Sequence, residues 1–386
     1  TIKAIAESLE MKNTKEDEEG IDPLVPAYRV DVQRPCDVVE DILRIYGYNN
    51  VEIPSELKSS LTIAGDADKD YKRENIVSEQ LVGEGFNEIL NNSLTKTSYY
   101  EKNELNKYTW DKTVKVMNPL SADLGVMRQT LLFGGLESIV RNINRKAKNL
   151  KFFEVGNCYW FNAEKHTPES PIKAYAQDYH MALWVTGKRV EGSWAHADED
   201  SSFYELKAYV DNIFRRVGIT REMLVEEPSD NNIFDKALTI ENHGGKTIAE
   251  LGIVNHKILK DFDIDQHVFY ADIDWQALMK MSHKIKLEFK VLSKYAAVSR
   301  DLALLIDDNV KFADIEKIAR QTEKKLLKRV ELFDVYTGKN LPAGKKSYAV
   351  NFILQDENKT LNDKAIDAIM KKLIHQLTTK LGAELR

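Results

Sequence analysis

Residues 26–48, PAYRVDVQRPCDVVEDILRIYGY, contain the change of hydrophobic period around which the rest of the chain can be organised. Apolar and polar residues alternate over Tyr28–Asp31, which predicts a strand. Pro35 interrupts this pattern, because proline lacks an N–H donor and restricts the residue before it. From Val38 the apolar residues follow helical spacing, and Gly47 is placed to end the helix. The stretch therefore predicts a strand, a turn and a helix.

Four carboxylates lie on this unit, at Asp31, Asp37, Glu40 and Asp41. The last three share one face of the predicted helix near its first turn. A structural interpretation makes Asp37 the N-cap and places Glu40 at the capping-box position. The alternative is a hard-cation site, because clustered oxygen ligands suit Mg²⁺. The residues by themselves leave both interpretations open.

The same stretch resembles the end of the B5 domain of the bacterial phenylalanine–tRNA ligase β subunit family. The matching letters are V-P-x-[YW]-R-x-D followed by D-x-x-E-[DE]-x-x-R-x-Y-G-Y. The resemblance implies that Asp31, Asp37, Glu40 and Asp41 are Mg²⁺ ligands shared with the family's α subunit. The family usually has Glu at the last position, and the shorter Asp41 allows a bridging water in place of a direct bond.

The length of 386 residues predicts two or three domains. No apolar run approaches the length needed to span a bilayer, and the first residues have no signal-peptide pattern. Cys36 and Cys158 are far apart and form no CxxC pair, which fits a reducing cytosol and argues against zinc. We therefore expect a cytoplasmic protein with no membrane partner.

The net charge of −6 is unevenly distributed. Residues 1–57 carry a net charge of −7, residues 58–292 carry −4, and residues 293–386 carry +5. A basic C-terminal part suggests a polyanionic partner, although modest positive charge is also common on helices. The acidic first part argues against a winged-helix reader of DNA, because such a reader needs cations for the phosphates.

Residues 114–155 predict a strand, a loop, a helix and a second strand. The first strand ends at Asn118, the helix covers Met127–Asn142 with a break at Gly134-Gly135, and the second strand starts at Phe152. A helix over residues 71–82 and a short strand at Phe86–Leu90 precede them.

Two polar stretches are expected to be loops. Residues 12–20, KNTKEDEEG, have no apolar anchor, and residues 165–202 are predominantly polar. His196 and the acids at 198–200 could suggest a metal cluster. Three contiguous acids cannot all face one ion from a strand or helix, so a solvated loop is the preferred interpretation.

The helix followed by EGFNEIL (residues 84–90) and the segment LKFFEVG (residues 150–156) resemble the first and second motifs of the family's class II synthetase-like module. An active class II site has Phe-Arg-x-Glu in the second motif, and the arginine clamps the ATP α-phosphate. Here Phe153 directly precedes Glu154, and no Gly-rich strand ending in arginine supplies a third motif. Because adenylyl transfer needs fixed cations, the resemblance implies a catalytically inactive module that packs against an α subunit, which binds the ATP.

From Ser293 the pattern is βαββαβ, which is the ferredoxin-like arrangement. The expected elements are strands at 298–306, 330–336, 347–355 and 383–386, and helices at 312–327 and 363–381. The helix-free face of such a sheet can carry aromatic and basic side chains toward single-stranded RNA. The candidates are Arg300, Phe333, Tyr336, Lys345 and Lys346. The alternative for the two aromatic residues is a place in the core.

The segments SRDLAL, LFDVYTG and P-x-G-K-K-S of this part resemble the family's anticodon-binding domain. The overall expectation is an α+β multidomain chain. It comprises a partial, winged-helix-like B5 domain (1–57), a class II synthetase-like antiparallel sheet with helices (58–292) and a ferredoxin-like domain (293–386). The expected partners are the α subunit in an α₂β₂ heterotetramer and the tRNA for phenylalanine, with Mg²⁺ as a shared cofactor. The alternative is a non-enzymatic RNA-binding or subunit-docking protein built from the same domains.

Overall fold

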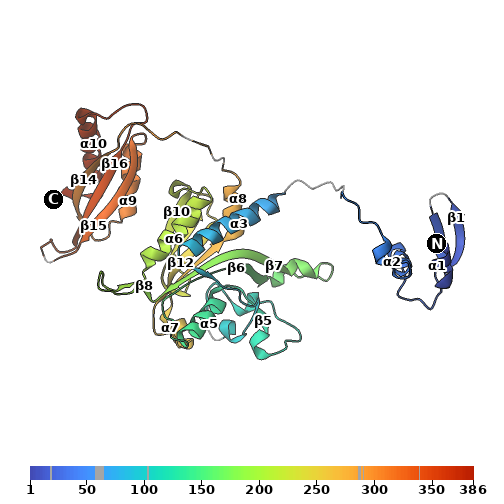
Figure 1. Ribbon diagram of the computed structural model, residues 1–386. Helices are drawn as coiled ribbons and strands as arrows, with labels where there is room; N and C mark the ends of the chain where they lie inside the picture. Colours follow the sequence, from blue (N-terminus) through green and yellow to red (C-terminus); the bar gives the residue numbers. More distant parts are fainter. Residues whose placement is uncertain (18–19, 57–64, 102–103, 286–287, 290, 339) are drawn as a thin grey trace. The chain divides into compact units, whose positions relative to one another are not determined.

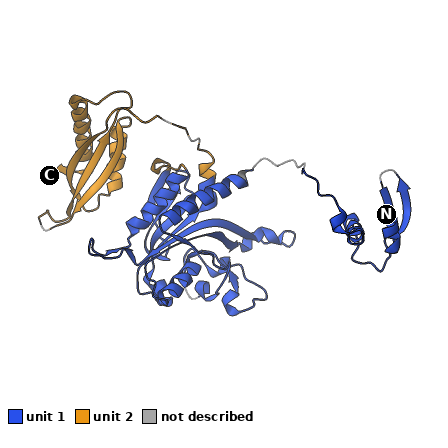
Figure 2. Cartoon of the chain, in the orientation of Figure 1, with its two compact units in different colours: residues 1–217, 224–279 blue, residues 218–223, 280–386 orange. Residues whose placement is uncertain are grey.

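The computed structural model describes residues 1–17, 20–56, 65–101, 104–285, 288–289, 291–338 and 340–386 (Figure 1). The chain divides into two compact units, residues 1–217 with 224–279 (unit 1) and residues 218–223 with 280–386 (unit 2) (Figure 2). The predicted domain boundary between residues 57 and 58 lies outside the described residues. Among the helices in the described ranges, none combines the length and the hydrophobicity that a membrane span requires.

The N-terminal part of unit 1 combines two helices with a β-hairpin. Its elements are α1 (Ile2–Ser8), β1 (Lys12–Asp17), β2 (Gly20–Leu24) and α2 (Pro35–Tyr46), with a 3-10 turn at Tyr48–Asn50. A small core of Ala6, Met11 and Val32 holds them together. The prediction of a loop over residues 12–20 is wrong where the residues are described, because β1 pairs with β2 through the backbone while its side chains are mostly exposed. Backbone pairing of this kind leaves no hydrophobic alternation to detect.

The prediction of a strand over Tyr28–Asp31 is also wrong. These residues form turns, in which the Arg29 N–H donates to the Pro26 carbonyl oxygen and the Val32 N–H donates to the Arg29 carbonyl oxygen. The predicted helix is confirmed as α2, and Gly47 follows it with a φ of +95°, a conformation that favours glycine. The N-cap is Arg34, and Asp37 stands three residues later.

The centre of unit 1 is a seven-stranded sheet in the order β10-β11-β12-β13-β7-β6-β3, antiparallel except for the β3–β6 pair. Its strands are β3 (Asn87–Glu88), β6 (Leu150–Phe161), β7 (Tyr175–Thr186), β10 (Leu224–Pro228), β11 (Phe234–Asn242), β12 (Thr247–Val254) and β13 (Val268–Asp274). Two short pairs lie outside it, β4 (Leu94–Thr95) with β5 (Val126–Met127) and β8 (Lys188–Val190) with β9 (Glu199–Asp200). The helices are α3 (Asp66–Gly83), α4 (Ser98–Glu101), α5 (Leu132–Ile143), α6 (Phe203–Arg216), α7 (His256–Asp261) and α8 (Trp275–Ser282).

Helices lie on both faces of this sheet (Figure 1). The amphipathic helix α6 packs on β12 and β13 from one side through Leu206, Val210 and Ile213. The core on the other side contains residues of α5 and α7 together with Tyr100, Leu105 and Tyr108. Trp184 and Tyr270 lie in the same core, so Leu105 and Tyr108 are packed against the sheet and are not on the surface.

Two further predictions for this region are wrong. Residues 165–202 are not one long loop, because they include β7, which pairs with β6 along its whole length. The first half of β7 is polar and exposed or partly buried, whereas its second half, Met181–Thr186, is buried. The expected helix starts at Leu132 instead of Met127, and it continues through Gly134-Gly135. A Cβ atom at Gly135 would lie 2.1 Å from the Trp184 ring, so this glycine permits close packing instead of breaking the helix.

Unit 2 contains the predicted ferredoxin-like sheet, with strand order β15-β16-β14-β17. Its elements are β14 (Val298–Asp307), α9 (Phe312–Thr322), β15 (Leu327–Tyr336), β16 (Lys345–Leu354), α10 (Asp363–Leu381) and β17 (Glu384–Leu385). Both helices pack on one face through a core that includes Ile315, Phe352 and Leu373. The βαββαβ prediction is confirmed, except that α9 ends at Thr322 and not at residue 327.

Candidate functional sites

The acidic residues near α2 fall into two groups. Asp31 and Asp41 converge on Arg29, whose Nη2 atom lies 2.6 Å from Asp41 Oδ2 and 3.2 Å from Asp31 Oδ2. The Nε atom of Arg29 also donates to Asp31 Oδ1 at 3.4 Å. The hydrogen bonds from Arg29 lower the pKa of Asp31. These two acids therefore share a cation that belongs to the chain itself.

Asp37 has a different role, since its carboxylate accepts hydrogen bonds from backbone N–H groups at the N-terminus of α2. It accepts hydrogen bonds from the backbone N–H groups of Arg34, at 2.8 Å, and Gln33, at 3.0 Å, and from the Arg34 guanidinium at 3.2 Å. These bonds, the backbone ones above all, lower the pKa of Asp37 to about 2. Glu40 is exposed on the next turn. The prediction of Asp37 as the N-cap and Glu40 at the capping-box position is wrong, because the N-cap is Arg34 and Asp37 itself stands at the third helical position, the place of the carboxylate in a capping box.

The four predicted ligands are thus not gathered around one point. Within the described ranges, no three His, Cys, Asp or Glu side chains are arranged to hold a metal ion. Carboxylate oxygens suit Mg²⁺ chemically. Their geometry does not suit it in this chain by itself, because Asp31 and Asp41 are bound to Arg29 and Asp37 is bound to backbone amides.

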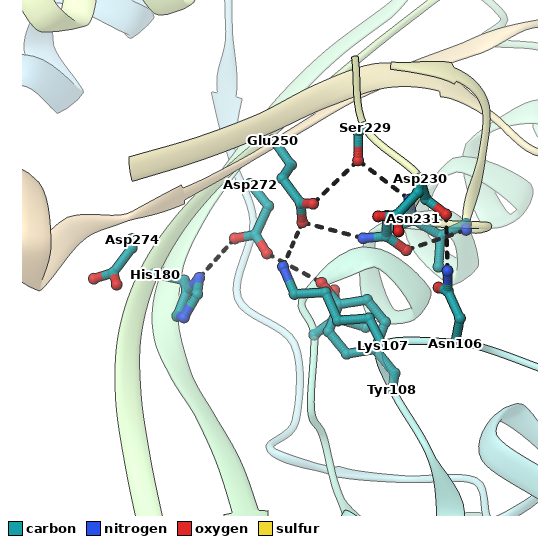
Figure 3. Close-up of polar contacts among 12 residues, drawn as sticks. Asn106, Lys107, Tyr108, His180, Ser229, Asp230, Asn231, Glu250, Asp272 and Asp274 are labelled. Atoms are coloured by element: carbon teal, nitrogen blue, oxygen red, sulfur yellow. Dashed lines mark hydrogen bonds and ion pairs between the residues drawn. The ribbon is translucent and has the colours of Figure 1, made fainter. Parts of the chain in front are cut away.

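A second polar cluster lies on the sheet face of unit 1 that is covered by residues 104–113, the covering loop (Figure 3). Glu250 on β12 accepts hydrogen bonds from Lys107, from the Ser229 hydroxyl at 3.2 Å and from the Asn231 amide at 3.1 Å. Asp272 on the neighbouring strand β13 is only 6% exposed. The cluster therefore places two acids of adjacent strands under a covering loop.

Asp272 pairs with a histidine across the sheet. His180 Nδ1 lies 2.7 Å from Asp272 Oδ1, and the Tyr108 hydroxyl donates to Asp272 Oδ2 at 3.4 Å (Figure 3). Burial by itself lowers the pKa of His180, but the neighbouring Asp272 carboxylate outweighs burial and the net pKa is raised. Burial raises and His180 lowers the pKa of Asp272, with a net decrease. This arrangement is a largely buried ion pair whose carboxylate also accepts a hydrogen bond from Tyr108.

The covering loop is fixed by several contacts. The backbone N–H of Asn106 donates to Asn232 Oδ1 at 3.0 Å, and the side-chain amide of Asn106 donates to the Asp230 carbonyl oxygen at 2.7 Å. Next to it, the ring of Tyr108 stacks on Trp160 with centroids 5.8 Å apart. Tyr108 is 1% exposed, and it fills the space above the sheet at this point.

Glu154, the acid of the expected second motif, also has a buried cation. Arg128 Nη1 lies 2.5 Å from Glu154 Oε1, and Arg128 Nε donates to the Asn157 carbonyl oxygen at 3.0 Å. The Asn91 amide donates to the other Glu154 oxygen at 2.6 Å. Arg128 is 5% exposed and Glu154 is 0% exposed. No local pattern predicts this pair, because its members lie 26 residues apart in the chain.

The five RNA-contact candidates in unit 2 are divided between the two faces of the sheet. In the strand register Tyr336 lies opposite Ser347 and Lys345 lies opposite Asp307. These positions alternate with the core residues of the sheet, so their side chains point away from α9 and α10. Phe333 lies at a β-bulge and is 60% exposed. These three residues are on or beside the face that the helices leave open.

Arg300 and Lys346 belong to the helix-covered face. Arg300 pairs in register with Phe352 and lies 3.7 Å from Asp363 at the start of α10. The Lys346 ammonium donates to the Asp308 carbonyl oxygen at 2.7 Å and lies 4.8 Å from the Tyr348 ring centroid. Sequence reasoning also missed Arg386, whose guanidinium lies 5.4 Å from the Tyr336 ring centroid on the open face.

Family models match the chain in three stretches. They are the phenylalanyl tRNA synthetase beta chain CLM domain over residues 53–275, the ferredoxin-fold anticodon binding domain over 293–386 and the tRNA synthetase B5 domain over 1–48. The pyrrolysyl-tRNA synthetase structure from Desulfitobacterium hafniense is similar with a TM-score of 0.41 and 14% identity, over 55% of this chain and 69% of that one.

Curated relatives are similar over the whole chain. The phenylalanine–tRNA ligase beta subunits of Bacteroides fragilis and Bacteroides thetaiotaomicron are 62% and 61% identical, and that of Porphyromonas gingivalis is 50% identical. Each match covers 100% of this chain and 47% of the relative, so the chain spans about half the length of these relatives. The first family model alone covers more than half of the chain. The resemblance inferred from the motifs is confirmed, and the chain belongs to the phenylalanyl-tRNA synthetase beta chain family.

Proposed function

We propose that this chain is the non-catalytic C-terminal part of a phenylalanine–tRNA ligase β subunit. In this role it scaffolds the catalytic α subunit, which binds ATP, within an α₂β₂ heterotetramer in the cytoplasm. Its C-terminal domain captures the anticodon of the tRNA for phenylalanine. The family membership supports the assignment, since relatives that match over the whole chain are named as beta subunits of this ligase.

The observation that carries the non-catalytic role is the buried pair of Arg128 and Glu154. An adenylating site needs cations that are free to hold phosphate oxygens. The arginine beside the expected second motif is buried, with its guanidinium bonded to Glu154 and to the Asn157 carbonyl oxygen. Tyr108 fills the same face of the sheet nearby. A class II-like sheet of this kind supports a partner subunit instead of binding a nucleotide.

Anticodon capture is assigned to the open face of the sheet in unit 2. Tyr336 and the exposed Phe333 supply rings on which unpaired bases can stack, and Lys345 supplies positive charge at one end of the face. Residues 293–386 have a net charge of +5, which favours a polyanion.

Mg²⁺ ligation is proposed only for the complex with α. The predicted donors are Asp31, Asp37, Glu40 and Asp41, and their carboxylates are chemically suitable. Because three of the four already have partners in this chain, a complete site requires groups from a second subunit or a rearrangement. The partial winged-helix-like assignment of this part is likewise a proposal.

Phenylalanine-dependent ATP–pyrophosphate exchange tests the division of labour. We expect no exchange from the chain alone, and exchange and tRNA charging after addition of an α subunit with complete class II motifs. Formation of aminoacyl-adenylate by the isolated chain would overturn the proposal. A stable complex with α that does not support charging would favour the docking-protein alternative. Removal of residues 293–386 should weaken tRNA binding at fixed salt.

A further inference from the structure

We propose that the end of α5 and the turn that follows it bind the phosphate backbone of a structured RNA. This surface of unit 1, which we call the basic turn, consists of four cations, Arg141, Arg145, Lys146 and Lys148. It is separate from the open sheet face of unit 2 to which anticodon capture is assigned. The inference rests on the tRNA-binding role proposed above and names a further surface for the same partner.

The basic turn interrupts an acidic part of the chain. Residues 138–153 contain five lysines and arginines and no aspartate or glutamate, whereas residues 58–292 as a whole carry a net charge of −4. The dipole of α5 favours cations within the last turn of the helix, which explains Arg141. The other three cations follow the end of the helix at Ile143, so the dipole does not account for them.

The four cations are exposed and are not neutralised by the chain itself. In the part of the chain that the structure describes, none of their side chains takes part in an ion pair or a hydrogen bond. The cations around them do have partners. Lys151, the fifth cation of the stretch, lies 3.1 Å from Glu205, and Lys188 on β8 lies 2.7 Å from Asp198. Positive charge is therefore left available for an external anion at the basic turn.

Hydrogen bonds hold the backbone of the basic turn in one conformation. The Arg145 N–H donates to the Asn142 carbonyl oxygen at 2.9 Å. Lys146 has a φ of +70°, which is uncommon for a residue with a Cβ atom and turns the chain back toward the sheet. At the far end, Gln266 Nε2 donates to the Lys148 carbonyl oxygen at 2.7 Å. Because the backbone is already fixed, binding of an anion has to order only the side chains.

The composition of the surface favours a nucleic acid over a protein as the partner. The exposed residues 144–149 are Asn, Arg, Lys, Ala, Lys and Asn, with no large apolar side chain among them. Protein–protein interfaces have an apolar core, and lysine is depleted in them. Contacts to phosphate oxygens, in contrast, come mainly from side chains such as Arg, Lys and Asn. The surface thus fits the backbone of the tRNA better than an acidic patch on the α subunit.

The experiment compares two double variants in the complex with α, each of which removes two positive charges. Arg145→Gln with Lys148→Gln changes the basic turn. Lys188→Gln with Arg189→Gln is the matched control, because both of its cations are already paired with acids. Binding of the tRNA for phenylalanine is measured by filter binding at several salt concentrations, and assembly with α is measured separately.

The first variant should reduce the slope of log affinity against log salt by about one to two and lower tRNA affinity about tenfold at low salt. The control should change the slope by less than about 0.5, because paired surface cations contribute little. Both variants should assemble with α as the wild type does.

Two outcomes would overturn this inference alone. One is an unchanged slope for the first variant in a complex whose wild type binds the tRNA, and the other is an equal reduction in the control, which would trace the effect to net charge. Weaker assembly with α at an unchanged tRNA slope would also overturn it and would assign the basic turn to the subunit interface. A wild-type complex that does not bind the tRNA would refute both the proposed function and the inference.

Discussion

Replacement of Arg128 by Met should strongly destabilise unit 1. Removal of one partner from a buried ion pair costs about 3–5 kcal/mol, because the remaining charge is left without compensation. Glu154 is fully buried but would keep two hydrogen bonds from Asn91, to Oε1 and to Oε2. Loss of the Arg128 bond to the Asn157 carbonyl oxygen adds about 1 kcal/mol. The retained bonds place the cost of breaking the ion pair near the lower end, at about 3 kcal/mol, so the expected total loss is about 4 kcal/mol.

Urea unfolding followed by tryptophan fluorescence measures this loss selectively. All five tryptophans lie in unit 1, at positions 110, 160, 184, 194 and 275. Combining Arg128→Met with Glu154→Gln removes both charges, so the double variant should recover about 1–2 kcal/mol of the single variant's loss.

Arg189→Met is the matched control. Arg189 pairs with Glu199 at 2.8 Å, but both side chains are more than half exposed, so this variant should cost at most about 1 kcal/mol. A loss below about 1 kcal/mol for Arg128→Met, or a double variant as unstable as the sum of the singles, would refute the assignment of this arginine as a structural counter-ion.

Three further predictions concern the other sites. Protonated His180 stabilises the fold through its ion pair with Asp272, and the pKa of His180 is raised in the folded protein. The stability advantage of the wild type over His180→Gln should therefore be complete below about pH 6.5 and should disappear as the pH rises through that raised pKa. Urea unfolding of both proteins at several pH values measures this difference in the free energy of unfolding. Tyr336→Ala should weaken tRNA binding by about tenfold with an unchanged salt slope, whereas Lys345→Ala should reduce the slope of log affinity against log salt by up to about one, both measured by filter binding. Asp37→Ala should increase amide exchange in the first turn of α2, measured by mass spectrometry.

The sequence predicted unit 2 well because its periodicities are strong. Strand β16 alternates buried and less buried residues over its second half, residues 350–354, and α10 buries residues at helical spacing from Ile366 to Leu377. Strand β7 lacked such a signal, because its first six residues are exposed or only partly buried and its last six are all buried. Neither half alternates, so the period of two that identifies a half-buried strand is missing.

The candidate sites depended on contacts that local patterns do not encode. Arg29 and Asp41 are 12 residues apart and meet because the chain turns at Pro26–Arg29 instead of forming a strand. The sequence identified the acids but not the cation that pairs with them. The same limit applies to Arg128 and Glu154, since a pairing between a loop and a strand is set by tertiary packing.

Strand alternation decides how the basic residues at 345 and 346 can act. Successive side chains of a strand point to opposite faces, so two adjacent lysines cannot both reach one RNA strand lying on one face. Lys345 is on the open face, where its ion pair with Glu384 at 2.6 Å raises its pKa and keeps it charged. Lys346 is on the helix side and donates to a backbone carbonyl oxygen. If RNA binds the open face, Lys346→Ala should leave the salt slope unchanged while Lys345→Ala reduces it. The opposite result would place the RNA on the edge of the helix-covered face.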